Sequence, residues 1–364
     1  MATLSAEERT ALQDAVIRLL ADRSSEADVR RTMDTPAGYD AELWRELSEM
    51  GVTGLLIDEQ FGGSGAGPME LEAVMEAAGA SLLCAPLLAS GVLAAELLRA
   101  LGDQAANLRL LPGIAAGTTI ATVALTGEAG DWTAEGVGVT ATGDTLSGAA
   151  SYVLHGQNAD VLLVLARDGD GLAVFEVDPK GAGVSIAALP TFDHTLRLAR
   201  IGFEGAKGRR LSGEAWPAAE AALRLALVAL AGEQAGGAKR VLDITVDYTK
   251  NRFQFGRAIG SFQAVKHMAA DILLEAEGAV SAARNAAARL AEGSADADAA
   301  VSLAAFACAD AFNYVTATAI QMHGGIAFTW ANPAHLYLRR ARADAQLFGA
   351  PAVHRERYLQ ALGA

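Results

Sequence analysis

The spacing of apolar residues divides the chain into three stretches, and the first covers residues 1–117. A capping box runs from Ser5 to Glu8, and apolar side chains then recur three or four positions apart, which is typical of an amphipathic helix. Gly51 ends a further helical pattern, and a glycine-rich loop precedes another that opens at Pro68. The pattern predicts an N-terminal domain built of helices.

The pattern changes in residues 118–212. Short runs of aliphatic and β-branched residues, such as residues 161–165 and 172–177, are separated by Gly, Asp and Asn. Several short strands with turn residues between them predict a small antiparallel β-barrel or sandwich.

Helical spacing returns in residues 213–364 and is sustained over long segments. The predicted helices cover residues 223–251, 262–291, 295–323, 333–348 and 352–362. Consecutive long helices joined by short loops predict an antiparallel four-helix bundle. The fold class is therefore α+β, with an N-terminal helical domain (1–117), a middle β-barrel or sandwich (118–212) and a C-terminal bundle (213–364).

Composition narrows the possible partners and location. Of the 364 residues 52% are hydrophobic, so a large core and an extensive subunit interface are expected, and the net charge of −14 argues against nucleic acid. Apolar runs fall short of the roughly 20 residues of a membrane span. No secretory signal opens the chain, so a cytoplasmic protein without a membrane span is expected. Cys84 and Cys308 lack metal-ligand spacing, so no metal site is predicted.

One loop carries side chains that a simple connection between helices does not need. Residues 252–263 hold two arginines, three phenylalanines, two glutamines and two glycines. A guanidinium forks onto phosphate or carboxylate oxygens, and aromatic faces and amides suit a flat heterocycle. The alternative is an ordinary interhelical turn with Phe255 and Phe262 in the core.

The segment Arg252-Phe-Gln-Phe-Gly256, with Phe262 and Gln263 after it, resembles the flavin-contacting turn of the acyl-CoA dehydrogenase family. A second segment, Gln321-Met-His-Gly-Gly325, is similar to the Gln-x-x-Gly-Gly element of that family. The rest of the chain follows the family's length and order from end to end. The resemblance implies FAD as the cofactor, an acyl-CoA substrate and a flavoprotein as electron acceptor.

In that family both segments reach from one subunit to the adenine and pyrophosphate of a FAD seated mainly in its neighbour. The resemblance therefore assigns cofactor contacts to Arg252, Phe255, Gly256, Gln263, Gln321, Gly324 and Gly325. In the β domain it adds Thr126, which matches a flavin-contacting threonine of the family. The family's hydroxyl beside flavin N5 is replaced there by Leu154.

The family's proton-abstracting carboxylate is missing from both of its usual positions. Phe348-Gly349 stands where a Glu-Gly pair is expected, and Ala226-Leu227 where a Glu-Arg pair is expected. Glu233 is the best remaining candidate for the catalytic base, because it is a carboxylate inside an otherwise apolar helix.

Glu233 lies about two helical turns beyond the usual base position, at roughly 3.6 residues per turn. The alternative role for it is an ion pair with Lys239 or with an arginine of another subunit. Asp344 and Glu356 are weaker candidates on a charged helix face.

These matches and losses favour a subunit that completes the FAD site of a Glu-bearing partner in an α2β2 assembly. Three alternatives remain open. One is a homo-oligomeric acyl-CoA dehydrogenase with Glu233 as a displaced base. Another is a flavin oxidase or monooxygenase on the same fold, and the third is a non-catalytic structural subunit.

Overall fold

The computed structural model describes residues 5–363, and the chain divides into two compact units. The first unit contains Arg31–Gly67 and Cys84–Ala226. The second contains Ser5–Arg30, Pro68–Leu83 and the chain from Leu227 onward. The predicted order of a helical, a β and a second helical region is confirmed.

Two helices of the first unit, α3 and α6, begin at an aspartate whose side chain caps the free N–H groups. Asp40 accepts hydrogen bonds from the second and third residues of α3, and Asp103 accepts one from Ala106 of α6. The helical elements are α3 (Ala41–Glu49), η1 (Glu59–Phe61), the π-helical segment η2 (Leu87–Ala94), α5 (Ala95–Leu101) and α6 (Gln104–Ala115).

The β region forms one seven-stranded sheet with the order β1-β4-β2-β3-β7-β5, to which β6 adds beside β7. The strands are β1 (Ala121–Ala124), β2 (Val139–Thr142), β3 (Thr145–Leu154), β4 (Val161–Asp168), β5 (Gly171–Val177), β6 (Val184–Ala188) and β7 (Leu198–Arg210). A further pairing of β4 with β5 closes a circuit through β4, β2, β3, β7 and β5.

The prediction of a wholly antiparallel sheet is wrong, because β4 runs parallel to both β1 and β2. Because β3 runs antiparallel to β2, the chain has reversed once when it leaves β3. It reverses again before β4, which therefore runs in the same direction as β1 and β2. Alternate residues of the strands, among them Phe175 and Phe203, fill the core of the sheet.

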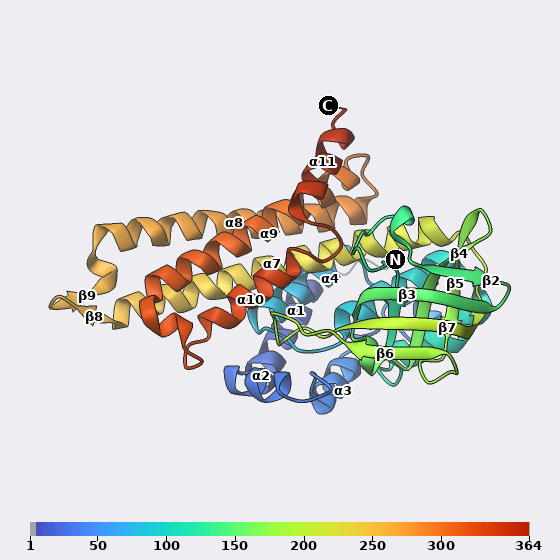
Figure 1. Ribbon diagram of the computed structural model, residues 1–364. Coiled ribbons are helices and arrows are strands. Elements are labelled where there is room, and N and C mark those ends of the chain that lie inside the picture. Colours follow the sequence, from blue (N-terminus) through green and yellow to red (C-terminus); the bar gives the residue numbers. More distant parts are fainter. Residues whose placement is uncertain (1–4, 364) are drawn as a thin grey trace. The chain divides into compact units, whose positions relative to one another are not determined.

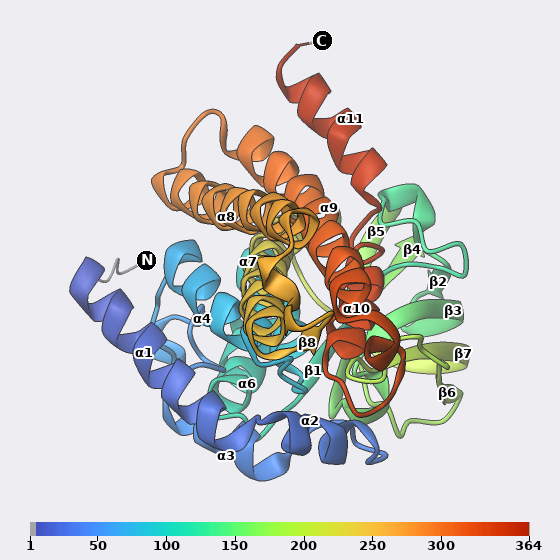
Figure 2. The same ribbon diagram turned by 90° about the vertical axis from the view of Figure 1, so that its left-hand side faces the viewer.

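The second unit is helical, and its helices are α1 (Ala6–Arg23), α4 (Pro68–Ala80), α8 (Gln263–Glu292), α9 (Ala297–His323), α10 (Ala334–Asp344) and α11 (Pro351–Ala361). The predicted capping box at Ser5 is confirmed. Two helices begin in one unit and end in the other: α2 (Glu26–Met33) and α7 (Ala215–Asn251). Figures 1 and 2 show α8 and α9 running side by side.

Glycines let α4 and α7 pack backbone to backbone. A Cβ atom on Gly79 would lie 1.9 Å from the carbonyl oxygen of Glu233, and one on Gly236 would lie 1.9 Å from that of Glu76. On another side of α7, a Cβ on Gly237 would meet the ring of Phe312 at 2.6 Å. The small residues around Glu233 therefore serve close helix packing.

Two segments in the described part of the chain are long and apolar enough to cross a bilayer, judged by length and composition alone. They are α7 and residues 297–328, whose apolar windows are 72% and 50% buried. Core helices of folded proteins have the same composition. The absence of a membrane span therefore stays a prediction.

Candidate functional site

The predicted loop after α7 is a short β-hairpin, formed by β8 (Phe253–Gln254) and β9 (Arg257–Ala258). Its two turn residues, Phe255 and Gly256, have φ angles of 54° and 77°. Positive φ at both positions is the type I′ arrangement that joins two strands with matching twist. Glycine adopts positive φ without strain, whereas phenylalanine does not, so Phe255-Gly256 is not a pair from which a two-residue hairpin turn would be predicted.

Phe255 projects from the tip of this hairpin and is 92% exposed. The alternative that placed it in the core is therefore wrong. The ring of Phe262 supports the hairpin from below, since Arg257 lies 3.9 Å above its centroid and Phe255 meets it edge-on at 6.1 Å. An exposed aromatic side chain in a strained backbone conformation is typical of a contact surface.

The second predicted segment forms an open turn at the end of α9. Gln321, Gly324 and Gly325 are exposed, and a Cβ atom on either glycine would meet nothing within 4 Å. The short helix η6 (Gly324–Phe328) follows and presents Phe328 with 81% exposure. Backbone left open at a glycine turn is a suitable approach for a phosphate group.

A stacked ring pair joins the hairpin to the glycine turn. Tyr248, in the last turn of α7, stacks on His323 with 4.4 Å between ring centroids, and its hydroxyl donates to the His323 carbonyl at 3.3 Å. The backbone carbonyl of Tyr248 also accepts from the Arg252 N–H, which opens the hairpin. Burial lowers the pKa of His323, so its ring stacks as a neutral group.

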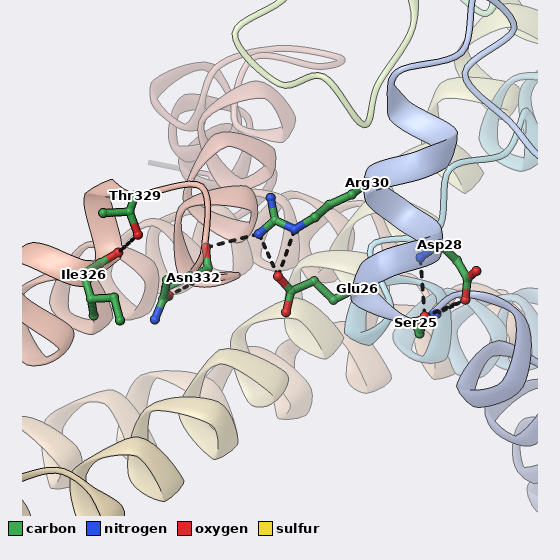
Figure 3. A network of polar contacts seen from close by, with 8 residues as sticks. Ser25, Glu26, Asp28, Arg30, Ile326, Thr329 and Asn332 are labelled. Carbon is green, nitrogen blue, oxygen red and sulfur yellow. Dashed lines mark hydrogen bonds and ion pairs between the residues drawn. The ribbon is translucent and has the colours of Figure 1, made fainter.

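The chain after the glycine turn is fixed to α2 (Figure 3). Arg30 donates to the carbonyl oxygen of Asn332 at 3.5 Å and forms an ion pair with Glu26 at 2.7 Å. Thr329 closes the turn by donating to the carbonyl oxygen of Ile326 at 2.7 Å. The segment that presents the two glycines is therefore held at both ends.

The donor set of these two segments fits the nucleotide part of FAD. It combines the guanidinium of Arg252, exposed amides of Gln263 and Gln321, and open glycine backbone. The Gln263 amide contacts His267 at 2.9 Å, one turn further along α8. Such groups can hold a pyrophosphate and an adenine without any deep pocket of their own.

Glu233 is buried in an ion pair with Arg340 of α10, and the two side chains are only 8% and 4% exposed. The predicted pairing with Lys239 or with another subunit is wrong, because the partner lies in the same chain. Arg340 also lies 3.4 Å from the carbonyl oxygen of Leu83. This geometry favours a structural counter-ion over a catalytic base, since a paired and buried carboxylate is costly to separate from its partner.

A small cavity lies beside the residues that directly follow the two usual base positions in the chain. Leu227 and Gly349 both line it, and its volume of about 10 Å³ holds one water molecule and no acyl chain. Phe348, which replaces the expected glutamate, is 1% exposed with a φ of 60°. Apart from Gln234, Asp344 and His354, the residues that line this cavity are apolar.

Asp344 and His354 also line this cavity. Asp344 is 2% exposed, so its predicted place on a charged helix face is wrong. Burial, with a contribution from Arg357, lowers the pKa of His354 to about 4, so its ring is neutral at physiological pH. Sequence reasoning named Asp344 only as a weaker candidate base and missed His354, because both lie in stretches rich in charged residues.

The first unit holds the predicted flavin contacts of the β region. Thr126 is 1% exposed, and its hydroxyl donates to the carbonyl oxygen of Asp131 at 2.9 Å. Tyr152, two residues before Leu154, has a φ of 57° and packs 3.0 Å from the place of a Cβ on Gly130. Leu154 itself is buried and offers no hydroxyl. Thr126 therefore has an internal partner, and the position of the lost hydroxyl is apolar.

Within residues 5–363 no group of three or more His, Cys, Asp or Glu side chains is placed to hold a metal ion. Cys84 and Cys308 are both buried, and no disulfide joins them.

Comparisons with known proteins agree along most of the chain. The profile of the acyl-CoA dehydrogenase N-terminal domain matches residues 6–118, and that of the C-terminal domain matches residues 213–363. The acyl-CoA dehydrogenase IpdE2 of Mycolicibacterium smegmatis is 35% identical over 349 residues, which are 95% of this chain and 96% of that protein.

Two solved structures superpose on nearly the whole chain. A chain of the ChsE4-ChsE5 complex from Mycobacterium tuberculosis has a TM-score of 0.90 at 31% identity, with 100% of this chain and 99% of that one covered. A chain of the Tcur3481-Tcur3483 steroid ACAD has a TM-score of 0.89 at 29% identity, with 98% of each chain covered.

Proposed function

This chain belongs to the acyl-CoA dehydrogenase family of FAD-dependent oxidoreductases, and we propose that it completes the FAD site of a catalytic partner subunit. In this proposal the hairpin β8–β9 and the turn at Gly324 reach the nucleotide end of a FAD that is seated mainly in the partner. The partner supplies the carboxylate that removes the α proton. The assembly is an α2β2 complex with two unlike chains.

A contrast between two sets of residues carries the proposal. The nucleotide-contacting segments are exposed, open and held in place by Tyr248 and Arg30. The two usual base positions hold Ala226 and Phe348, which are apolar and buried, and Glu233, the candidate base taken from the sequence, is paired with Arg340. A chain that keeps one half of a shared site and loses the other is suited to completing the site of a neighbour.

Each nucleotide-contacting residue has a definite task in this scheme. When bound, FAD supplies the ring that accepts a hydride from the acyl chain. Arg252 offers its guanidinium to the pyrophosphate, and the open backbone at Gly324 and Gly325 receives a phosphate oxygen. The amides of Gln263 and Gln321 donate to acceptors of the nucleotide, and Phe255 covers it with an aromatic face.

Two relatives support the choice of partner and substrate. The ChsE4-ChsE5 complex joins two differently named chains, in keeping with an assembly of unlike subunits. The Tcur3481-Tcur3483 protein is called a steroid ACAD, so we include a steroid-derived acyl-CoA among the candidate substrates. The electron acceptor in this scheme is a separate flavoprotein, and the complex is cytoplasmic.

The test compares the chain alone with the chain co-expressed with a glutamate-bearing acyl-CoA dehydrogenase subunit. We expect bound FAD and anaerobic bleaching by straight-chain or steroid-derived acyl-CoA only in the co-expressed complex. Arg252→Gln should lower the FAD content of that complex, whereas Arg289→Gln, an exposed change on α8, should not. Bleaching of flavin by the lone chain would overturn the proposal.

The same experiment separates the other functions. A homo-oligomeric dehydrogenase that uses Glu233 would bleach without a partner and would lose that activity in Glu233→Gln. A flavin oxidase would consume oxygen in step with substrate. A purely structural subunit would leave the FAD content of the complex unchanged in Arg252→Gln.

A further inference from the structure

The second unit contains a cavity of about 240 Å³ that none of the flavin-contacting residues lines. It lies between three helices and is lined by Arg9, Thr10 and Gln13 of α1, Glu72 of α4 and Arg284 of α8. Its polar groups come from segments far apart in the sequence.

Glu72 is the unusual member of this cavity. Glu72 is only 4% exposed. Its Oε1 atom is buried and has no hydrogen-bond partner among the described residues. The α4 backbone at this position packs closely on α7, since a Cβ on Gly232 would lie 2.8 Å from the Glu72 carbonyl oxygen. The carboxyl group is therefore held in place at the cavity, with one of its two oxygens buried and without a hydrogen-bond partner among the described residues.

Two arginines flank Glu72, and each is positioned by another carboxylate. Arg284 forms an ion pair with Glu76 at 2.8 Å, and Arg9 lies 3.6 Å from Glu70. A guanidinium has five N–H donors, so one carboxylate leaves donors free for a ligand. Both side chains are partly exposed, at 54% for Arg284 and 24% for Arg9.

We propose that this cavity binds a small oxyanion, a phosphate or a carboxylate, between Arg9 and Arg284 with the Glu72 carboxyl group as a hydrogen-bond donor. The two guanidinium groups provide the positive charge and the forked geometry that such an anion needs. A neutral carboxyl group donates its own proton to an anion oxygen.

Proton binding at Glu72 is coupled to this site. Three charged groups influence the pKa of the Glu72 carboxyl group, namely Glu76 of α4, Arg284 of α8 and Arg9 of α1. Glu72 in turn contributes to raising the pKa of the Cys308 thiol of α9. Burial, and then the charge of Glu76, raises the pKa of Glu72 to about 8. Above that pH the ionised carboxylate repels an anion, so binding weakens as pH rises.

The experiment is calorimetric titration of the complete protein, as purified, with inorganic phosphate and separately with acetate. The charge of acetate is constant between about pH 7 and about pH 9, so acetate reports the titration of the protein. We expect acetate to bind about tenfold more weakly at the higher pH, since Glu72 is then mostly ionised. Binding of phosphate alone or of acetate alone identifies the preferred oxyanion.

Three variants separate the roles of the residues. Glu72→Gln keeps a donor and cannot titrate, so it should bind acetate equally at both pH values. Arg284→Gln should lose at least about tenfold in affinity at both, as expected for a lost charge-assisted pair. Arg289→Gln, which changes an exposed arginine further along α8, is the matched control and should bind like the unmodified protein.

Two results would overturn the inference. The first is that neither anion binds at millimolar concentration to protein whose circular dichroism and melting temperature show it to be folded. The second is that Arg284→Gln binds as tightly as the Arg289→Gln control. A fall of affinity with pH that persists in Glu72→Gln would remove Glu72 from the site.

Discussion

The Glu233–Arg340 pair shows how burial decides the role of a single charged residue. A carboxylate inside an apolar helix is a candidate base when only the sequence is known. In the folded chain it is covered on one side by α4 and neutralised on the other by α10. Removing one member would leave the other charged and buried, which is more costly than removing both.

Arg340→Ala is therefore expected to lower the free energy of unfolding by about 3–5 kcal/mol, the usual cost of breaking a buried pair from one side. The double change Glu233→Leu with Arg340→Met should recover most of that loss, because it leaves no buried charge. Chemical denaturation of the three proteins measures both effects. A double variant no more stable than Arg340→Ala would contradict this account.

His354 gives the fold a dependence on pH. Its pKa falls from an ordinary value of 6.5 to about 4 on burial, so the unfolded chain takes up a proton in acid before the folded chain does. The stability contributed by the neutral ring is present above pH 6.5 and is lost as pH falls toward 4.

His354→Gln should therefore show a smaller loss of unfolding free energy between those pH values than the unmodified chain. Urea denaturation at a series of pH values measures the slope. His267→Gln, which alters an exposed histidine of α8, is the control and should leave the slope unchanged. Equal slopes in His354→Gln and the control would refute the assignment.

At the scale of the helix, glycine spacing determines which elements approach each other. Gly79 and Gly236 lie where α4 and α7 touch, and neither position has room for a Cβ atom. Gly278, on the exposed side of α8, has nothing within 4 Å of the place of a Cβ. A change from glycine to alanine should therefore lower the stability of the fold at Gly236 of α7 and raise it at Gly278 of α8.

Gly236→Ala is expected to destabilise the chain by about 1–3 kcal/mol, because it forces two backbones apart. Gly278→Ala should stabilise it by about 0.5–1 kcal/mol, since alanine loses less backbone entropy in a helix. Thermal denaturation of both variants under the same conditions tests the difference. Similar melting temperatures for the two would show that α4 and α7 are not closely packed.

The hairpin β8–β9 is the element in which local strain and exposure coincide. Phe255 occupies a left-handed conformation that costs a non-glycine residue about 1–2 kcal/mol. Its ring is 92% exposed and contributes little to the core. We therefore expect the strained conformation of Phe255 to serve a contact with a cofactor or a partner subunit rather than the stability of this chain.

Phe255→Gly should leave the free energy of unfolding unchanged or raise it by up to about 1 kcal/mol, because strain is relieved while chain entropy increases. The FAD content of the assembled complex should fall in the same variant. Leu359→Ala, a comparable exposed change on α11, should alter neither. Unchanged FAD content in Phe255→Gly would contradict a cofactor-contacting role for the hairpin.

At the scale of the whole molecule, exposed apolar side chains mark surfaces that need a partner. The first half of α8 exposes Leu273 by 45% and Leu274 by 73%. Isolated apolar residues on a surface are common, whereas two neighbouring exposed leucines on one helix are candidates for an interface with a partner subunit. The overall excess of hydrophobic residues agrees with this reading.

Leu274→Glu is expected to prevent assembly with the partner subunit, because a charge would be buried at the interface. Light scattering should show a smaller species, with circular dichroism unchanged. Leu362→Glu, at an exposed site just after α11, is the matched control and should assemble normally. Normal assembly of Leu274→Glu would exclude this face of α8 from the interface.

Local patterns in the sequence were sufficient for the order of helices and strands, the capping box at Ser5 and the two segments that resemble flavin contacts. Each depends on residues only a few positions apart, so the chain itself specifies them. The turn residues Phe255 and Gly256 form a hairpin that local preference did not predict, because tertiary context overrode the strain at Phe255.

Only the tertiary structure decided which distant residues meet. It paired Glu233 with Arg340, buried Asp344, placed β4 parallel to two strands and enclosed Glu72 beside two arginines. These outcomes depend on how elements far apart in the sequence pack, and a charged residue looks alike in sequence whether it faces water or a buried partner. The sequence determined the elements and the candidate chemistry, and packing decided which charges remain available to a ligand.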